Sequence, residues 1–266
     1  MLPSFIGIGA QRCGTTWLYE SLAAHPQVFV STPKELYFFT KNYGRNVDWY
    51  EGHFEGRNDA LAWGEITPGY FYRPEALERI ASDVPEARLF VILRNPVDRA
   101  LSAYNFFKAR QYAGLDFREA LQRDESILGQ GMYSVGIDRL RRHFSQQQVL
   151  VLLYDDIVES PDKLVSRLYD FVGVDPEFRP EMLRRRINQS IFPRTQKVLV
   201  RLGLSNAINR VKQSPLGDAI QKWHLQRRDT DRSDNSGERE FLCAYFKDEI
   251  DRLQKRLDRD LSGWLE

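Results

Sequence analysis

The sequence is poor in the two residue types that most often bind transition metals. Only two cysteines, Cys13 and Cys243, occur among its 266 residues, and a reducing compartment would keep both as thiols. The four histidines are scattered along the chain without the spacing of metal ligands. We therefore expect two free thiols and no metal site.

The chain also lacks an excess of either charge and lacks long hydrophobic runs. Thirty-eight basic residues against thirty-seven acidic ones give a net charge of +1, so any site for a polyanion must be local, and we expect no nucleic acid partner. The longest apolar runs, 89–93 and 149–153, are far shorter than the roughly 20 residues that cross a bilayer. Because residues 1–9 also lack the pattern of a signal peptide, we expect a cytoplasmic protein without a membrane span.

Short apolar runs alternate with longer stretches of helical period, which is typical of an α/β protein built on a central parallel sheet flanked by helices. The runs that predict strands are 4–8, 28–30, 61–64, 89–93 and 149–153. The stretches that predict helices are 15–24, 74–82, 96–110, 133–144, 161–171 and 238–257.

The length favours a single domain, 1–266. We divide it into an α/β nucleotide-binding core, 1–175, and a mostly helical C-terminal extension, 176–266, because the strand pattern ends near Asp175. Charged stretches at 184–186 and 226–234 in the extension predict solvated surface.

The first predicted strand leads into a glycine-bounded loop, Gly9 to Thr16, and then into an amphipathic helix. Such a unit leaves backbone N–H groups at the positive end of a helix, where a phosphate accepts hydrogen bonds from them. Gly9 and Gly14 let the backbone approach the anion closely, and the hydroxyls of Thr15 and Thr16 add donors. An ordinary βα turn that contains glycines is the alternative explanation for this stretch.

The spacing of Gly9 and Gly14 matches the P-loop pattern G-x-x-x-x-G-K-[ST], which makes the predicted sheet P-loop-like. Thr15, however, occupies the position of the P-loop lysine, and Arg12 places a cation inside the loop itself. The loop therefore suits a 5′-terminus with two anionic groups better than a triphosphate.

A second group of residues follows the predicted strand 89–93. Arg94 stands at its carboxyl end, which is where ligands bind to open α/β sheets, and its guanidinium can grip a phosphate in bidentate fashion. Asn95 and Pro96 are suited to cap and open the next helix, and Ser102 lies one to two turns into it. A capped surface turn with a solvated arginine is the alternative interpretation.

Taken together, these two segments resemble the sulfotransferases that use 3′-phosphoadenosine-5′-phosphosulfate (PAPS), in particular the branch that includes the heparan sulfate sulfotransferases and bacterial relatives. The resemblance implies that the loop holds the 5′-phosphosulfate and that Arg94 and Ser102 bind the 3′-phosphate. It also implies that Glu35 is the catalytic base and that Tyr133 lies near the nucleotide. The loop residues assigned to the donor are Gln11, Arg12, Cys13, Gly14, Thr15 and Thr16.

Further segments that resemble the family cover nearly the whole chain, and the likeness is strongest over residues 4–104. These segments are 34–39, which contains Glu35, then 49–54, 65–71, 131–133 and 260–264. Three positions depart from the family pattern. Arg12 replaces a lysine that many members have, Ile66 replaces a second lysine, and Tyr37 stands where some heparan-modifying members have a further catalytic polar residue.

The resemblance implies an in-line sulfuryl transfer to a hydroxyl, or less readily an amine, of a carbohydrate or small-molecule acceptor. Arg12 and the loop N–H groups would stabilise the charge that grows on the bridging oxygen, Glu35 would take the acceptor proton, and no metal would be needed. Two alternatives stay open. A P-loop kinase or NTPase is favoured by Asp155 and Asp156 after the last predicted strand, and a non-catalytic nucleotide-binding protein would keep the loops without a working base.

Overall fold

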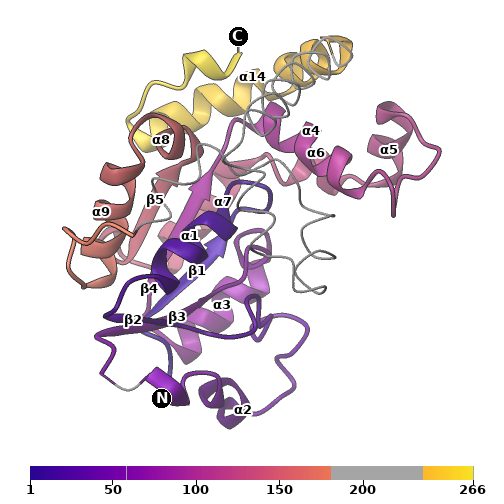
Figure 1. Cartoon of the computed structure of the whole chain (residues 1–266). Helices are drawn as coiled ribbons and strands as arrows, with labels where there is room; N and C mark the ends of the chain where they lie inside the picture. The colour runs from indigo at the N-terminus through magenta and orange to yellow at the C-terminus, as the bar shows by residue number, and fades with distance from the viewer. Residues whose placement is uncertain (58, 181–235, 266) are drawn as a thin grey trace, which may run out of the picture. The chain divides into compact units, whose positions relative to one another are not determined.

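The computed structural model describes residues 1–57, 59–180 and 236–265. Its centre is a five-stranded parallel sheet with the strand order β2-β3-β1-β4-β5 (Figure 1). The strands are β1 (Phe5–Gly9), β2 (Val28–Val30), β3 (Ala62–Ile66), β4 (Arg88–Leu93) and β5 (Val149–Leu153). The predicted strands and the predicted α/β class are thus confirmed, with shifts of at most two residues at the strand ends.

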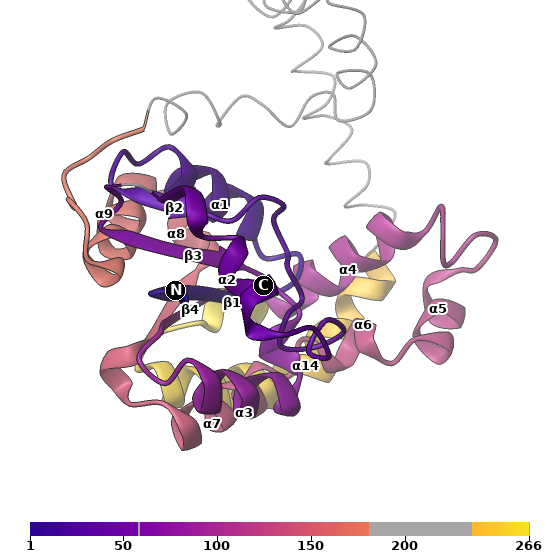
Figure 2. The ribbon, with the colours of Figure 1, turned by 90° about the horizontal axis from the view of Figure 1, so that it is seen from below.

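Helices cover both faces of the sheet, as Figure 2 shows. One face carries α1 (Thr15–Ala23), α8 (Tyr154–Glu159) and α9 (Pro161–Val172). The other carries α3 (Pro74–Asp83), α7 (Tyr133–His143) and α14 (Ser236–Leu257). Because both faces are covered, β1 and nearly all of β4 are buried, which explains why the two strands are continuous apolar runs in the sequence.

Gly64 shows how closely the two central strands approach. It pairs with Phe5 across β3 and β1, and a Cβ at this position would lie 2.1 Å from the carbonyl oxygen of Phe5. A side chain of any size would therefore push the strands apart. Glycine at this position is a packing requirement of the sheet and not a turn signal.

The helix predicted over 96–110 is shorter than expected, because α4 covers Pro96–Phe107. Beyond Phe107 the chain turns back, and Tyr112 becomes buried with its ring stacked 6.0 Å from the ring of Tyr104. The gain from burying this aromatic ring outweighs continuation of the helix. The sequence prediction missed four short helices, α2 (Val47–Gly52), α5 (Phe117–Arg123), α6 (Ser126–Gly129) and α8.

Residues 1–180 and 242–266 form one compact unit. The residues of the candidate site lie in the described part of this unit. The charged stretches at 184–186 and 226–234 lie outside the described residues, and the single-domain division stays a prediction.

Candidate active site

Three of the segments predicted to form the site lie at the carboxyl ends of strands. The loop that contains Arg12 follows β1, the segment with Glu35 follows β2, and Arg94 follows β4. In the sheet, β1 and β4 are neighbours. The chain leaves β1 toward β2 at one edge of the sheet and leaves β4 toward β5 at the other edge, so the strand order reverses between β1 and β4. Open α/β sheets bind ligands at such a point.

The loop after β1 has the backbone of an anion-binding turn. Arg12 has φ 67° and Gly14 has φ 97°, and Gly14 is the N-cap of α1 without a side chain to cap the helix. A Cβ on Gly14 would also lie 3.0 to 3.1 Å from Ile157 and Tyr154 of α8. The backbone conformation therefore favours glycine here, and a side chain would also crowd α8. The missing side-chain cap leaves the first turn of α1 available to an anion.

Arg12 and Ser102 are 90 residues apart in the sequence, but their side chains are in contact. The Nε and Nη2 atoms of Arg12 donate hydrogen bonds to Ser102 Oγ over 3.3 and 3.2 Å. The guanidinium also lies 4.1 Å from the centre of the Phe106 ring. Burial and the nearby positive charge of Arg94 lower the pKa of Arg12 below its ordinary value. An anion bound here would offset both effects.

Among the described residues, the charge partner of Arg94 is a distant one. Its Nη2 lies 3.7 Å from Asp98 Oδ2, its guanidinium is 4.7 Å from the Tyr154 ring, and its side chain is 24% exposed. Its buried Nε has no hydrogen-bond partner among the described residues. A buried donor without a partner is costly, so this atom fits a ligand that supplies an acceptor.

Asn95 caps α4 as predicted, because its Oδ1 accepts a hydrogen bond of 2.9 Å from the Val97 N–H. Its Nδ2 donates to the carbonyl of Trp264, 169 residues later, over 2.9 Å. The Trp264 indole N–H in turn donates to Asp155 over 3.0 Å, and Arg259 pairs with Asp156 over 2.5 and 3.0 Å. Asp155 and Asp156 are thus engaged by the C-terminal segment, which weakens the comparison with a magnesium-binding strand end.

Cys13 and Tyr133 lie beneath the loop rather than at its surface. Both side chains are fully buried, and Cys13 Sγ is 3.6 Å from Tyr133 Oη. Burial raises the pKa of the Cys13 thiol, although its hydrogen bond with Tyr133 acts in the opposite direction. The Tyr133 side chain therefore supports the loop from α7.

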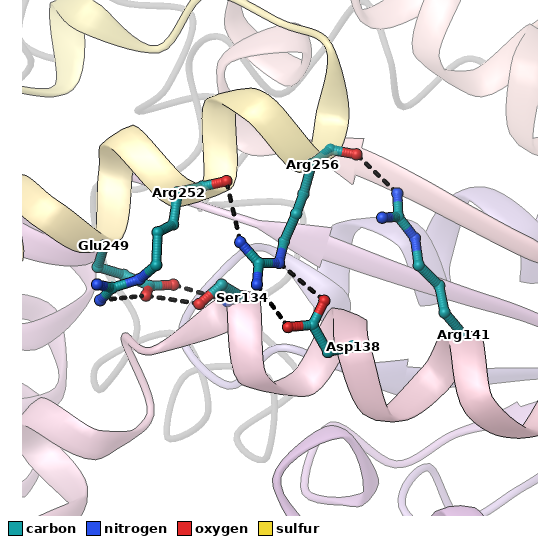
Figure 3. A network of polar contacts seen from close by, with 6 residues as sticks. All are labelled: Ser134, Asp138, Arg141, Glu249, Arg252 and Arg256. Atoms are coloured by element: carbon teal, nitrogen blue, oxygen red, sulfur yellow. Dashed lines mark hydrogen bonds and ion pairs between the residues drawn. The ribbon is translucent and has the colours of Figure 1, made fainter.

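The N-terminus of α7 is capped by a residue that the sequence analysis did not identify. Glu249, 1% exposed on α14, accepts hydrogen bonds from the Ser134 N–H (2.6 Å) and from Ser134 Oγ (2.7 Å), as Figure 3 shows. Arg252 approaches the same carboxylate to 3.2 Å, and Arg256 pairs with Asp138 nearby. The available signal was the position of Glu249 on the buried stripe of α14, which otherwise consists of Leu242, Phe246, Ile250 and Leu253.

Glu35 is tied to the loop through its neighbour. Lys34 Nζ donates to Thr16 Oγ1 over 3.2 Å and lies 3.5 Å from Glu35 Oε1. The Tyr37 hydroxyl donates to the other oxygen, Oε2, and the Glu35 side chain is 33% exposed. Burial and the Glu35 carboxylate raise the pKa of Tyr37 to about 12, so at neutral pH the phenol is a hydrogen-bond donor to Glu35 and not itself a base.

Two departures noted in the sequence now have a structural setting. Tyr37 contacts Glu35 directly, whereas Ile66 is fully buried in β3 beside Gly7. Glu65, next to Ile66, is also fully buried and accepts hydrogen bonds from three hydroxyl groups.

Among the described residues, no helix has the length and apolarity that a bilayer crossing requires. In the same part of the chain, no group of three or more histidine, cysteine, aspartate or glutamate side chains is placed to hold a metal ion.

Comparison with known proteins gives a consistent result. Residues 2–214 match the family model described as a sulfotransferase domain. The chain is 28% identical over 291 residues to the bifunctional heparan sulfate N-deacetylase/N-sulfotransferase 4 of Mus musculus, covering 99% of this chain and 31% of that protein. It is 32% identical over 180 residues to the heparan sulfate glucosamine 3-O-sulfotransferase 6 of Mus musculus, covering 65% of this chain and 52% of that protein.

Among solved structures, a sulfotransferase from Alicyclobacillus acidocaldarius superposes with a TM-score of 0.74 at 26% identity, with complete coverage of both chains. The chain spans about a third of the length of the first of the curated relatives and about half of the second.

Proposed function

The chain belongs to the sulfotransferase domain family, and from this membership we propose that it transfers a sulfuryl group from PAPS to a hydroxyl of a carbohydrate or small-molecule acceptor. The observation that carries the proposal is the convergence of Arg12, Arg94 and Ser102 beside the uncapped first turn of α1. Two cations and a helix N-terminus in one place are suited to a ligand with several anionic groups.

The donor-site residues fit the two ends of PAPS. The N–H groups at the start of α1 and the hydroxyls of Thr15 and Thr16 would hold the 5′-phosphosulfate. Arg94, whose buried Nε has no partner among the described residues, and Ser102 would hold the 3′-phosphate. Gln11 and the Cys13 backbone belong to the same loop, and Tyr133 contributes by packing under it. When bound, PAPS supplies an activated sulfuryl group on a phosphate leaving group.

The proposed reaction is a single in-line displacement. The acceptor oxygen forms a bond to sulfur while the bond from sulfur to the bridging oxygen breaks, and 3′-phosphoadenosine-5′-phosphate (PAP) leaves. Arg12 would stabilise the charge that grows on the bridging oxygen, and Glu35 would accept the proton that the acceptor hydroxyl loses. Lys34 links the loop to Glu35, since it contacts both Thr16 and Glu35.

An anionic carbohydrate is the acceptor class that the surroundings of Glu35 support. Three cations lie over aromatic rings in or beside the segment that follows it: Lys41 over Tyr37, Arg45 over Trp49 and Arg79 over Tyr43, at 3.8, 4.7 and 4.0 Å. Lys41 and Arg45 are exposed. Cations of this kind can pair with the acidic substituents of a sugar chain, and the two relatives above are named for heparan sulfate.

The kinase or NTPase alternative is not favoured. Thr15 occupies the position of the P-loop lysine, and Asp155 and Asp156 are bound by Trp264 and Arg259. A non-catalytic binding protein would bind the nucleotide but would transfer no sulfuryl group. An assay of sulfuryl transfer therefore distinguishes it from an enzyme.

Calorimetry with PAP, ADP and ATP tests the donor site. We expect PAP to bind much more tightly than the other two, and Arg94→Ala to weaken PAP binding by roughly 1.5–3 kcal/mol, the range for hydrogen bonds to charged groups. Equal affinities for the three nucleotides would overturn the proposal.

Transfer of label from [³⁵S]PAPS to heparan sulfate oligosaccharides, with neutral maltooligosaccharides as the control, then tests turnover and the acceptor class.

A further inference from the structure

Glu65 is a fully buried carboxylate at the carboxyl end of β3, outside the donor site. Its Oε1 accepts hydrogen bonds from the hydroxyls of Tyr50 (2.8 Å) and Tyr70 (3.1 Å), and its Oε2 accepts one from Thr67 Oγ1 (2.6 Å). Burial raises the pKa of the Glu65 carboxyl, while these hydrogen bonds act in the opposite direction. Its burial makes it unsuited to take a proton from an acceptor. The role of Glu65 is therefore to be sought in the three hydroxyl groups that donate to it.

Two of these hydroxyls hold the segment that contains Glu35. The Tyr37 N–H donates to Thr67 Oγ1 over 3.3 Å, and the Phe39 N–H donates to the Tyr70 hydroxyl over 3.4 Å. A hydroxyl has one proton and two acceptor lone pairs. Because each hydroxyl donates its proton in a hydrogen bond to Glu65, the lone pairs of Thr67 and Tyr70 are left to accept hydrogen bonds from the backbone N–H groups.

The segment needs such anchors, because its backbone is unusual. Glu35 has φ 69° and Tyr37 has φ 52°, both in the left-handed region that side chains other than glycine disfavour. The segment 34–39 has no helix or strand to hold it. Conformations of this kind persist only where the surrounding structure fixes them.

The anchor is also connected to the loop that follows β1 and contains Arg12. The Thr67 N–H donates to the carbonyl of Gly7 over 2.9 Å, and Gly7 lies in β1, the strand that leads directly into the loop. The same residue therefore contacts the strand that positions Arg12 and the segment that positions Glu35.

Building on the proposed function, we infer that Glu65, acting through Thr67 and Tyr70, is a positioning residue that fixes Glu35 relative to the sulfuryl donor. Glu65 touches neither donor nor acceptor in this scheme. It orients the hydroxyls of Thr67 and Tyr70, and these accept hydrogen bonds from two backbone N–H groups. The backbone held in this way places the Glu35 carboxylate and the Tyr37 hydroxyl that donates to it.

Thr67→Val and Thr67→Ser form the test pair. Valine has nearly the shape of threonine without its hydroxyl, so the Tyr37 N–H loses its acceptor and Glu65 Oε2 loses a donor. Serine keeps the hydroxyl. We expect Thr67→Val to lower kcat with [³⁵S]PAPS and heparan sulfate oligosaccharides by about 10- to 100-fold, as for a small misplacement of a reacting group. KM for PAPS and Kd for PAP should stay within twofold, and Thr67→Ser should restore most of kcat.

Amide hydrogen exchange gives a readout that does not depend on turnover. Exchange at Tyr37 should accelerate in Thr67→Val and stay slow in Thr67→Ser, because only valine removes the acceptor of that N–H. If Thr67→Val does not fold, Tyr70→Phe removes the anchor of Phe39 and is measured in the same way.

Tyr169→Phe is the matched control for lost stability. Its buried hydroxyl donates to the Ser21 carbonyl over 2.7 Å between α9 and α1, so its loss should lower the melting temperature without changing kcat. The inference is overturned if Thr67→Val keeps the wild-type kcat, or if Tyr169→Phe loses as much kcat. A wild-type chain that transfers no label overturns the proposed function instead, and the exchange rates then decide the anchoring alone.

Discussion

In the proposed mechanism, both donor binding and stabilisation of the transition state depend on Arg12. In the structure it donates to Ser102, stacks on Phe106 and lies close enough to Arg94 for the two charges to repel. Unlike lysine, arginine offers a planar fork that can grip two acceptors at once, and it does not lose its proton. Binding of an anionic ligand between the two arginines would remove their repulsion.

Arg12→Ala should lower turnover more than it lowers affinity for PAP. The charge on the bridging oxygen is largest in the transition state, so a group that stabilises it contributes mostly to kcat. Steady-state kinetics with [³⁵S]PAPS and calorimetry with PAP measure the two effects separately. Losses of equal size would make Arg12 a binding group only.

Glu35→Gln should leave PAP binding almost unchanged and lower turnover by about 10²–10⁴, the usual contribution of a positioned general base. Glutamine keeps the size of the side chain and can still accept from Tyr37, but it cannot take a proton. The loss should be largest for an alcohol acceptor and smaller for a partly ionised phenol. Near-normal sulfation of an alcohol by the variant would show that Glu35 is not the base.

The sequence could identify these residues but not their contacts. Arg12 and Ser102 were both assigned to the donor, yet their mutual hydrogen bonds require β1 and β4 to be neighbours in the sheet. Glu65 lay within a recognised segment, but its three partners come from separate turns, and its burial depends on the packing of all of them.

At the scale of elements, the contact between α7 and α14 links the C-terminal helix to the loop that follows β1. Glu249 caps α7 through Ser134 (Figure 3). The preceding residue, Tyr133, packs against Cys13 in the loop. Met132, the N-cap residue of α7, provides no side-chain cap of its own. The N-terminus of α7 is therefore stabilised by a residue more than 110 positions away.

Glu249→Ala should destabilise the fold by about 0.5–2 kcal/mol, the cost of losing an N-cap, and should also weaken PAP binding modestly. Glu249→Gln keeps one oxygen for the Ser134 N–H and should cost less. Asp251→Ala, at an exposed position of the same helix, is the control and should be nearly neutral. Urea unfolding and calorimetry measure the two effects. Unchanged stability in Glu249→Ala would mean that the cap contributes nothing.

Elements whose burial imposes a regular apolar pattern were predictable from the sequence. The five strands and the helices α1, α3, α7, α9 and α14 are of this kind. The short helices were missed because they are too short for an apolar period to show, and two of them, α2 and α5, begin at local side-chain caps. The Asp116 and Glu119 capping box before α5 and the Asn46 cap of α2 were present in the sequence as signals of this second type.

At the scale of the whole molecule, binding at the proposed ligand site is expected to be coupled to folding. The C-terminal segment contacts the ends of β4 and β5 through Trp264 and Arg259, and the loop after β1 packs on α8 through Gly14. A ligand bound where these elements meet holds together parts that are distant in sequence. Contacts of this kind link binding to global stability.

PAP at 100 times its Kd should therefore stabilise the folded state by about 2.7 kcal/mol and raise Tm by roughly 5–10 °C. ADP at the same concentration should raise Tm much less, because it lacks the 3′-phosphate. Differential scanning fluorimetry with both nucleotides provides the comparison. Equal shifts would contradict selection of the 3′-phosphate.

Cys13 offers a clock for opening of the loop. Its thiol is buried, and its pKa is raised by burial, so an alkylating reagent can reach a reactive thiolate only when the loop separates from α7. Cys243 is partly exposed and should react first, which provides an internal reference in the same chain. Mass spectrometry of the slow modification, with and without PAP, would time how often the bare loop opens. A ligand that fastens the loop should lengthen that interval.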